Sequence, residues 1–215
     1  MSFFEYLSYS WDHVLELAIG HAVVVAISLA IAVVIGVSLG ILVYRRERAA
    51  SALLAVTSTF LTIPSLALFA IFIPIFGLGY KPAVVALVMY ALLPILRNTV
   101  TGLRSVDPAI AESAQGMGMS ARERLFRIEL PLAWPVIIAG VRVSTMLLMG
   151  IAAIAAVVNG PGLGDDIFAG LARIGGANAL NLVLGGTLGI IVLALLFDTF
   201  FNVLSKLTTS RGIRD

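Results

Sequence analysis

The sequence predicts an all-α polytopic membrane protein, a helical bundle of about five transmembrane helices. Of its 215 residues, 60% are hydrophobic and 12% are charged, whereas soluble domains have about 45–50% apolar and about 25% charged residues. The mean hydropathy is +1.06, and a soluble chain of this length cannot bury so much apolar surface. The absence of cysteine excludes disulfides, thiolate metal sites and cysteine nucleophiles.

The predicted spans come from the uncharged stretches, because crossing a bilayer core of about 30 Å takes about 20 helical residues. The second stretch contains Pro64 and Pro74, so we expect that helix to be kinked or broken. The third must continue past Arg97, with that side chain extending to the surface. The predicted spans are residues 20–43, 49–80, 82–97 and beyond, 134–158 and 181–205. A total of six spans is an alternative.

Two glycine pairs have the four-residue spacing that lets helices approach closely in lipid, Gly36 with Gly40 and Gly185 with Gly189. We expect them to pack within one bundle, although a dimer seam is an alternative. We assign them no functional role.

Basic residues predict the orientation, because Lys and Arg are enriched in cytoplasmic loops. With five spans, only Lys81 and Arg173 fall outside, and the segment before Gly20 has acidic but no basic residues. We therefore expect the N-terminus outside and the C-terminus in the cytoplasm, with no cleavable signal peptide. The inside residues are Arg45, Arg46, Arg48, Arg97, Arg104, Arg122, Arg124, Arg127, Lys206, Arg211 and Arg214.

One long polar segment, about residues 97–133, separates the third and fourth spans and predicts two short cytoplasmic helices. Asp107 is a good N-cap, and Pro108 fits a first helical turn. Glycine can end this helix at Gly116 or Gly118, because it adopts a left-handed conformation at little cost.

The second short helix begins with a capping box, Ser120 to Glu123. We expect Pro131 and Pro135 to end it and to open the fourth span. This segment is therefore a helix–glycine–helix hairpin facing the cytoplasm.

A spaced motif runs through this hairpin: Glu112-Ser113-Ala114, three residues, Gly118, nine residues, Ile128, one residue, and Leu130-Pro131. It resembles the E-A-A loop of permease subunits in ATP-binding-cassette (ABC) importers. Ser113 replaces the family's first alanine, a small-for-small change. The resemblance implies that the hairpin is the coupling helix, which docks in a groove on a cytoplasmic ATPase, and that residues 1–215 form a single permease domain. The coupling residues it implies are Glu112, Ser113, Ala114, Gly118, Ile128, Leu130 and Pro131.

Five further segments, from His21 to the loop 159–165, resemble permeases for osmoprotectants such as glycine betaine, carnitine, choline and proline betaine. Asn159 and Pro161 depart from the family's usual glycine-rich loop. The resemblance implies an ATP-driven importer of quaternary-ammonium compounds in a bacterial or archaeal inner membrane. Permeases for other small solutes, such as amino acids, share the E-A-A loop but match these segments less well. The segments are residues 21–42, 62–68, 77–82, 90–99 and 159–165.

The family also implies partners: a second permease, identical or paralogous, ATPase subunits and an external binding protein. A nucleotide-binding P-loop needs lysine followed by Ser or Thr, but Lys81 precedes Pro82 and Lys206 precedes Leu207. We therefore expect this chain to bind no cofactor, with ATP and magnesium held by the partner ATPase. Membrane lipid is the other expected partner, and nucleic acid is not one.

Ionisable residues and prolines inside spans are the other candidate sites. Arg142 and Asp198 lie at similar depths from the cytoplasmic face, so we expect either an interhelical ion pair or separate partners near the membrane surface. Pro64, followed by Ser65, frees a backbone carbonyl that could line a translocation path, although a plain kink is the simpler interpretation.

The histidines and the outer acidic residues favour no metal site. His13 and His21 are about 12 Å apart along a helix, too far for one ion, so we expect both at the membrane interface. Asp165 and Asp166 are expected to be solvated loop acids, although contact with a binding protein or a passing cation is an alternative. An outer aromatic belt is predicted from Trp11, Tyr6 and Tyr9.

Two other classes of protein fit less well. An intramembrane hydrolase needs a nucleophile and a base at matching depth, and no Gly-x-Ser-x-Gly elbow occurs in the chain. A channel with the loop 160–164 as its filter would have no use for a coupling hairpin. ATP-independent flux would identify the channel.

Overall fold

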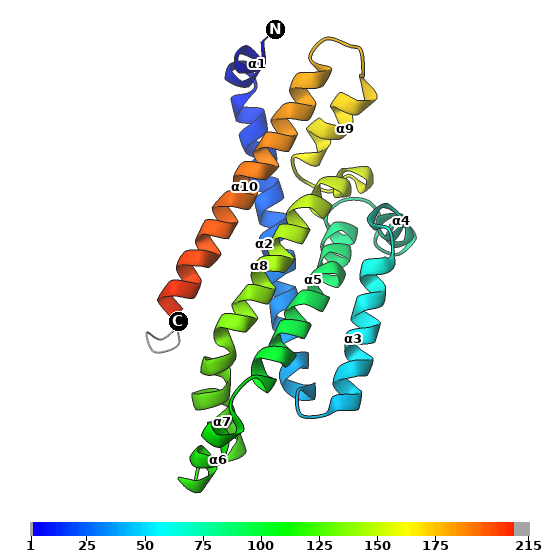
Figure 1. Ribbon diagram of the computed structural model, residues 1–215. Coiled ribbons are helices and arrows are strands. Elements are labelled where there is room, and N and C mark those ends of the chain that lie inside the picture. Colours follow the sequence, from blue (N-terminus) through cyan, green and yellow to red (C-terminus); the bar gives the residue numbers. More distant parts are fainter. Residues whose placement is uncertain (1, 209–215) are drawn as a thin grey trace.

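The computed structural model describes residues 2–208, and within that range it contains helices and no strands. The predicted all-α fold is therefore confirmed. Figure 1 shows the long helices side by side, with α1 at one end of the bundle and α6 and α7 at the other. Arg211 and Arg214 lie outside the described residues. The elements are α1 (Phe3–Tyr9), α2 (Trp11–Val43), α3 (Glu47–Thr62), α4 (Ser65–Phe76), α5 (Tyr80–Arg104), α6 (Pro108–Gly116), α7 (Ala121–Arg124), η1 (Leu125–Glu129), α8 (Leu130–Ile154), η2 (Ala155–Val158), α9 (Gly164–Ala172) and α10 (Ala179–Thr208).

Among the described residues, four helical runs are long and apolar enough to cross a membrane, and α3 with α4 adds a fifth candidate span. The four runs are α2, α5, α10 and the run Ala121–Val158. Their positions agree with the predicted spans. α2 begins at Trp11 rather than near residue 20, because a helix can extend beyond the apolar core into the polar interface.

The centre of the bundle is α5, whose most apolar stretch is 61% buried, more than that of the other three long runs. It packs between α2 and α8. Glycines permit this packing: a Cβ added to Gly36 would lie 2.8 Å from Ile95 Cγ2, and one on Gly40 would lie 2.5 Å from Thr99 Cγ2. Because no larger residue fits without displacement, the predicted close packing of this pair is confirmed.

The outer layer is formed by α10, which packs against α9, α8 and α2. A Cβ added to Gly185 would lie 3.3 Å from Tyr6, and one added to Gly189 would lie 2.9 Å from Leu163. This second glycine pair therefore also packs within the chain.

The second predicted span is broken, as its prolines indicate. α3 ends at Thr62 and α4 begins at Ser65, and their axes differ by 97°. The hydroxyl of Tyr90 donates a 2.6 Å hydrogen bond to the Ile63 carbonyl at the break. That bond satisfies a backbone group that the helix leaves unpaired.

The prediction that Pro131 and Pro135 end the second short helix is wrong. The helix continues from Ala121 to Val158, with Pro131 in the first turn of α8 and Pro135 inside it. A π-helical turn, η1, precedes Pro131, and the Leu130 amide bonds the Leu125 carbonyl five residues back. The wider turn changes the hydrogen-bond register just before the residue that has no amide hydrogen.

Candidate coupling site

The first short helix, α6, has the predicted boundaries. The Asp107 carboxylate accepts a 2.8 Å hydrogen bond from the Ala109 amide, and Pro108 occupies the first turn. α6 ends at Gly116, and Gly118 in the following turn has φ +86°. This is a left-handed conformation that glycine adopts without strain.

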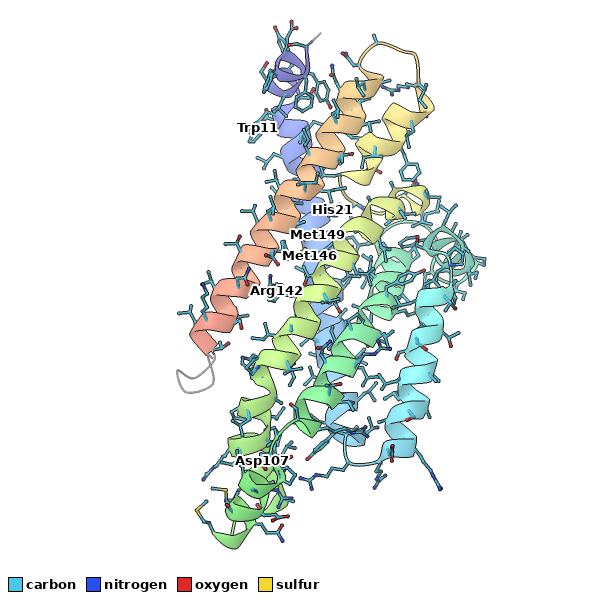
Figure 2. All side chains as sticks on the ribbon, in the orientation of Figure 1. Trp11, His21, Asp107, Arg142, Met146 and Met149 are labelled. Atoms are coloured by element: carbon cyan, nitrogen blue, oxygen red, sulfur yellow. The ribbon has the colours of Figure 1, made fainter. Side chains whose placement is uncertain are left out.

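The second short helix, α7, begins with the predicted capping box. The Glu123 amide donates to Ser120 Oγ at 3.3 Å, and the Ser120 amide donates to Glu123 Oε2 at 2.9 Å. We call residues 107–124 the coupling hairpin. Figure 2 marks its start by Asp107, at the end of the bundle opposite Trp11.

The residues of the E-A-A pattern fall into two groups. On the hairpin, Glu112, Ser113 and Gly118 are exposed, whereas Ala114 is buried. At its base, where α7 continues into α8, the structure places Ile128, Leu130 and Pro131; Pro131 is exposed and the other two are half-buried. The pattern therefore joins an exposed helical surface to the start of a membrane helix.

A buried acid at the base of the hairpin was not predicted. Glu129 accepts hydrogen bonds from Tyr44 Oη at 2.5 Å, Arg45 Nη2 at 2.9 Å and Arg124 Nε at 3.0 Å. Burial, followed by the hydrogen bond to Glu129 and its negative charge, raises the pKa of Tyr44 to about 12. The phenol therefore stays a donor at neutral pH. An acid between the apolar residues 128 and 130 was the available signal, but two of its partners, Tyr44 and Arg45, lie far away in sequence.

Arg142 and Asp198 meet between α8 and α10. The Asp198 Oδ1 atom accepts from Arg142 Nη2 at 2.7 Å and from Arg142 Nε at 3.0 Å, and Asn202 donates to Asp198 Oδ2 at 3.0 Å. Figure 2 shows Arg142 part-way along α8. The interhelical ion pair is therefore present, and its role in assembly stays a prediction.

Pro64 and Ser65 lie at the break between α3 and α4. Pro64 precedes α4 and is exposed, and Ser65 is half-buried. Their position explains the bend of the helix pair, and a role in a translocation path stays a prediction.

The outer acidic pair differs from the prediction. Asp165 is exposed, but Asp166 is buried and is not a solvated loop acid. Asp166 Oδ1 lies 2.9 Å from His13 Nε2, and Tyr6 Oη lies 3.5 Å from Asp166 Oδ2. Tyr6 is buried beside it, so it does not belong to the exposed aromatic belt, whereas Trp11 and Tyr9 are exposed.

The predicted interfacial position of His21 is wrong, whereas His13 is exposed. His21 is fully buried, and its Nε2 lies 3.1 Å from the Met149 carbonyl oxygen. Figure 2 shows both residues within the bundle. The backbone at Gly162 covers the ring, since a Cβ there would lie 2.7 Å from His21 Nδ1. Among residues 2–208, no group of three or more acidic or histidine side chains could hold a metal.

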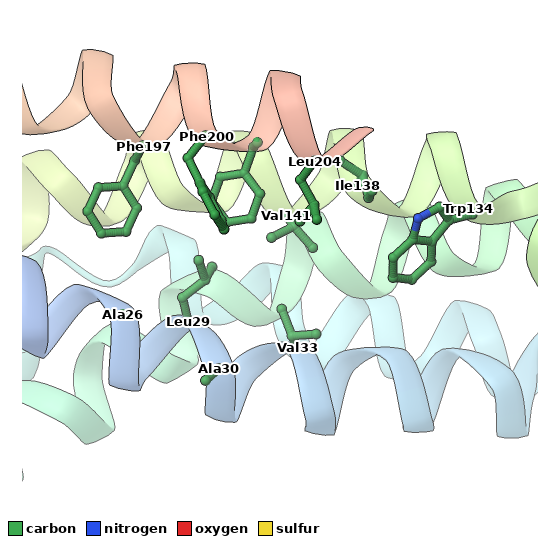
Figure 3. A pocket seen from close by; sticks show the side chains of 11 residues that line it. Ala26, Leu29, Ala30, Val33, Trp134, Ile138, Val141, Phe197, Phe200 and Leu204 are labelled. Carbon is green, nitrogen blue, oxygen red and sulfur yellow. The ribbon is translucent and has the colours of Figure 1, made fainter. Parts of the chain in front are cut away.

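An apolar groove of about 320 Å³ lies between α2, α8 and α10. Figure 3 shows Leu29, Trp134, Phe197 and Phe200 among the side chains that line it. Its lining residues are apolar or aromatic, and the indole N–H of Trp134 is already used, since it donates to Thr208 Oγ1 at 2.8 Å.

Comparisons with known proteins agree with this architecture. Residues 11–210 match the family described as "binding-protein-dependent transport system inner membrane component". The chain is 41% identical over 175 residues to a choline transport system permease protein of Bacillus subtilis, covering 81% of this chain and 79% of that protein. It is 36% identical to an osmoprotectant import permease protein of Salmonella typhimurium over the full length of both.

The fold is also found in a solved structure, an inward-facing form of the MetNI methionine ABC transporter. The TM-score is 0.79 at 21% identity, covering 92% of this chain and 96% of the other. The chain therefore belongs to the binding-protein-dependent inner membrane components, the multi-pass permease subunits of ABC importers.

Proposed function

We propose that this chain is the permease subunit of an ATP-driven importer for a quaternary-ammonium osmoprotectant, such as choline, glycine betaine, carnitine or proline betaine. The names of its relatives support this solute class, since they transport choline and osmoprotectants. We place recognition of the cation in the external binding protein, and this chain then supplies the path through the membrane. An aromatic cage holds such cations through cation–π attraction.

The coupling hairpin is the observation that carries the mechanism. It presents Glu112 and Ser113 on an exposed helix with well-formed caps, beyond the end of the membrane helices. In this proposal α6 docks on a separate ATPase subunit, which binds ATP and magnesium. ATP-driven closure of two ATPases then moves two permeases between outward-open and inward-open states.

The charges support an orientation with the hairpin in the cytoplasm. Five arginines at this end of the bundle are exposed: Arg45, Arg46 and Arg48 at the α2–α3 connection, Arg122 on the coupling hairpin and Arg127 in η1. Acidic residues without basic ones occupy α1 and the start of α2 at the other end. The positive-inside rule then places the N-terminus outside and the C-terminus in the cytoplasm.

Uptake into vesicles tests the proposal. The complex is reconstituted with its ATPases facing the vesicle interior and the binding protein added outside. It should accumulate radiolabelled choline, glycine betaine or carnitine only when the vesicles contain ATP. Accumulation of an amino acid instead would replace the proposed solute. ATP-independent flux of the solute would replace the importer by a channel.

Variants of one glycine test the coupling hairpin. Gly118→Val should reduce uptake at least about tenfold, because a β-branched residue is strained at positive φ. Gly118→Asn should retain most of the uptake, since asparagine tolerates this conformation. Gly116→Ala is the matched control, because Gly116 has open space around it and no positive φ. Equal uptake by all three variants would contradict the assigned role of the hairpin.

A further inference from the structure

Glu129 lies at the junction between the coupling hairpin and the membrane helix α8. The residue is 5% exposed. An ionised carboxylate buried to this extent is stable only when it is paired and hydrogen-bonded. Its surroundings therefore matter more than those of the exposed acids on the same hairpin.

The partners of Glu129 come from two separate parts of the chain. Tyr44 and Arg45 belong to the connection between α2 and α3, whereas Arg124 is the last residue of α7. Both carboxylate oxygens are used: Oε1 accepts from the two arginines, and Oε2 accepts from Tyr44 and, at 3.3 Å, from Arg45. We call these four residues the Glu129 clamp.

Two more hydrogen bonds extend the Glu129 clamp. Arg124 Nη1 donates to Gln115 Oε1 of α6 at 2.9 Å. Arg104 Nε, from the end of α5, donates to the Tyr44 carbonyl at 2.7 Å. The network therefore connects α6 and α7 of the coupling hairpin with the cytoplasmic ends of α2 and α5.

The π turn η1 makes this arrangement possible. In an α-helix, residues five apart point about 140° away from each other, because each residue turns the chain by about 100°. In a π turn the i→i+5 hydrogen bond places them one above the other. Arg124 directly precedes η1 and Glu129 is its last residue, so the two side chains span this turn, and Arg124 Nε reaches Glu129 Oε1 at 3.0 Å.

The coupling hairpin has few other attachments. The main contacts of α6 are with α7 and η1, and Ala114 is the buried residue of that helix. Leu125 and Leu130 add apolar contacts to the cluster around Leu103. A displacement of α6 therefore reaches the bundle by two routes, the short link 105–107 to α5 and the segment that holds Arg124 and Glu129.

We propose that Glu129 is a positioning residue that fixes the coupling hairpin to the α2–α3 connection, so that a displacement of α6 moves α2 and α8 together. This inference rests on the proposed function, because it assumes that an ATPase docks on α6 and moves it. Without the clamp, α6 still docks, but its movement is lost at a loose junction. ATP hydrolysis is then only weakly coupled to transport.

The test uses Glu129→Gln in the complete complex in vesicles, with ATP hydrolysis and uptake measured together. Glutamine keeps the shape but replaces an acceptor oxygen by an amide that faces donors, which removes charge-assisted hydrogen bonds. We expect the number of ATP molecules hydrolysed per solute imported to rise about tenfold, while the stimulated hydrolysis stays within about twofold of wild type. Glu47→Gln is the matched control, since Glu47 is an exposed acid at the same end of the bundle, and its ratio should not change.

A distance measurement separates positioning from a general loss of stability. The chain contains no cysteine, so Met117→Cys and Arg48→Cys introduce two unique spin labels at exposed positions. Labelled chain is diluted with unlabelled chain, so that distances within one chain dominate. We expect a narrow distribution with Glu129 and a broad one with Glu129→Gln.

Tyr44→Phe provides a second variant that removes one donor and leaves both arginines on the acid. It should raise the ATP-to-solute ratio less than Glu129→Gln, and the double variant should equal Glu129→Gln alone, because the two residues act through one contact. If Glu129→Gln does not accumulate, Tyr44→Phe carries the test with the same measurements.

An unchanged ratio with an unchanged distance distribution overturns the inference, as does a proportional loss of hydrolysis and uptake without broadening. Failure of the proposed function looks different. In that case the wild-type complex shows no ATP-dependent uptake, whereas the label distances still report whether Glu129 holds the hairpin.

Discussion

Two buried acids at opposite ends of the bundle are stabilised in different ways. Glu129, at the hairpin end, is paired with two arginines and a tyrosine. Asp166, at the other end, has one close partner, His13 at 2.9 Å, and a longer contact to Tyr6 at 3.5 Å. The first acid has cations that stay charged at every physiological pH, whereas the second depends on a histidine.

This difference determines how well each buried acid tolerates the loss of one partner. Arg45 is 47% exposed and Arg124 is 13% exposed, so either arginine still neutralises Glu129 when the other is removed. Asp166 has no second cation among the described contacts. We therefore infer that the hairpin end is held by redundant contacts and the outer end by a single one.

The largest effect is expected in the membrane interior, where the ion pair of Arg142 and Asp198 has one cation for one acid. Arg142→Leu leaves Asp198 charged in a span, which costs about 2.5–3.5 kcal/mol near the bilayer centre. Thermal unfolding in detergent should shift down by several degrees, at about 2–4 °C per kcal/mol for a chain of this size.

The double variant Arg142→Leu with Asp198→Leu is the control, because replacing both charges by apolar groups is often neutral. It should recover most of the lost thermal stability. A single variant that melts within about one degree of wild type would show that the pair contributes little.

The second prediction compares the two ends directly. His13→Ala leaves the buried Asp166 without its closest hydrogen-bond partner and should lower the free energy of unfolding by about 1–2 kcal/mol. Arg45→Ala removes a half-exposed partner of Glu129 and should cost less than about 1 kcal/mol, because Arg124 remains. Thermal unfolding of both variants in the same detergent measures the difference. The comparison between the ends fails if Arg45→Ala is the more destabilising change.

Local signals predicted the spans and the hairpin from the sequence. Asp107 with Pro108 and Ser120 with Glu123 act within four residues, so the helix starts could be located without the tertiary structure. The pairing of Arg142 with Asp198 was among the alternatives because each residue's depth follows from its distance to the end of its span. Pro131 shows the limit of a local rule, since the π turn before it let the helix continue.

The clusters around the two buried acids could not be predicted, because all their partners except Arg124 are far from the acids in sequence. Glu129 and Arg45 are 84 positions apart, and His13 and Asp166 are 153 positions apart. His21 was misplaced for the same reason: the loop that covers it contains Gly162, from the other half of the chain. Charge patterns along a chain give depth and side of the membrane, but not which helices are neighbours.

The smallest expected effect concerns Asp165, the exposed neighbour of Asp166. Burial, followed by the negative charge of Asp166, raises the pKa of Asp165, and the nearby His13 lowers it. Because an acid with a raised pKa binds protons more tightly in the folded state, ionised Asp165 lowers stability at neutral pH, and this loss disappears as pH falls through its folded pKa.

Asp165→Asn should therefore raise the unfolding temperature at pH 7, by the equivalent of less than about 0.5 kcal/mol for a surface position. The gain should shrink as pH is lowered toward the ordinary aspartate pKa, where the wild-type carboxyl is protonated. Melting curves of both proteins between pH 7 and pH 4 measure it. A gain that grows on acidification would contradict this prediction, because it would mean that the fold stabilises Asp165 as an anion.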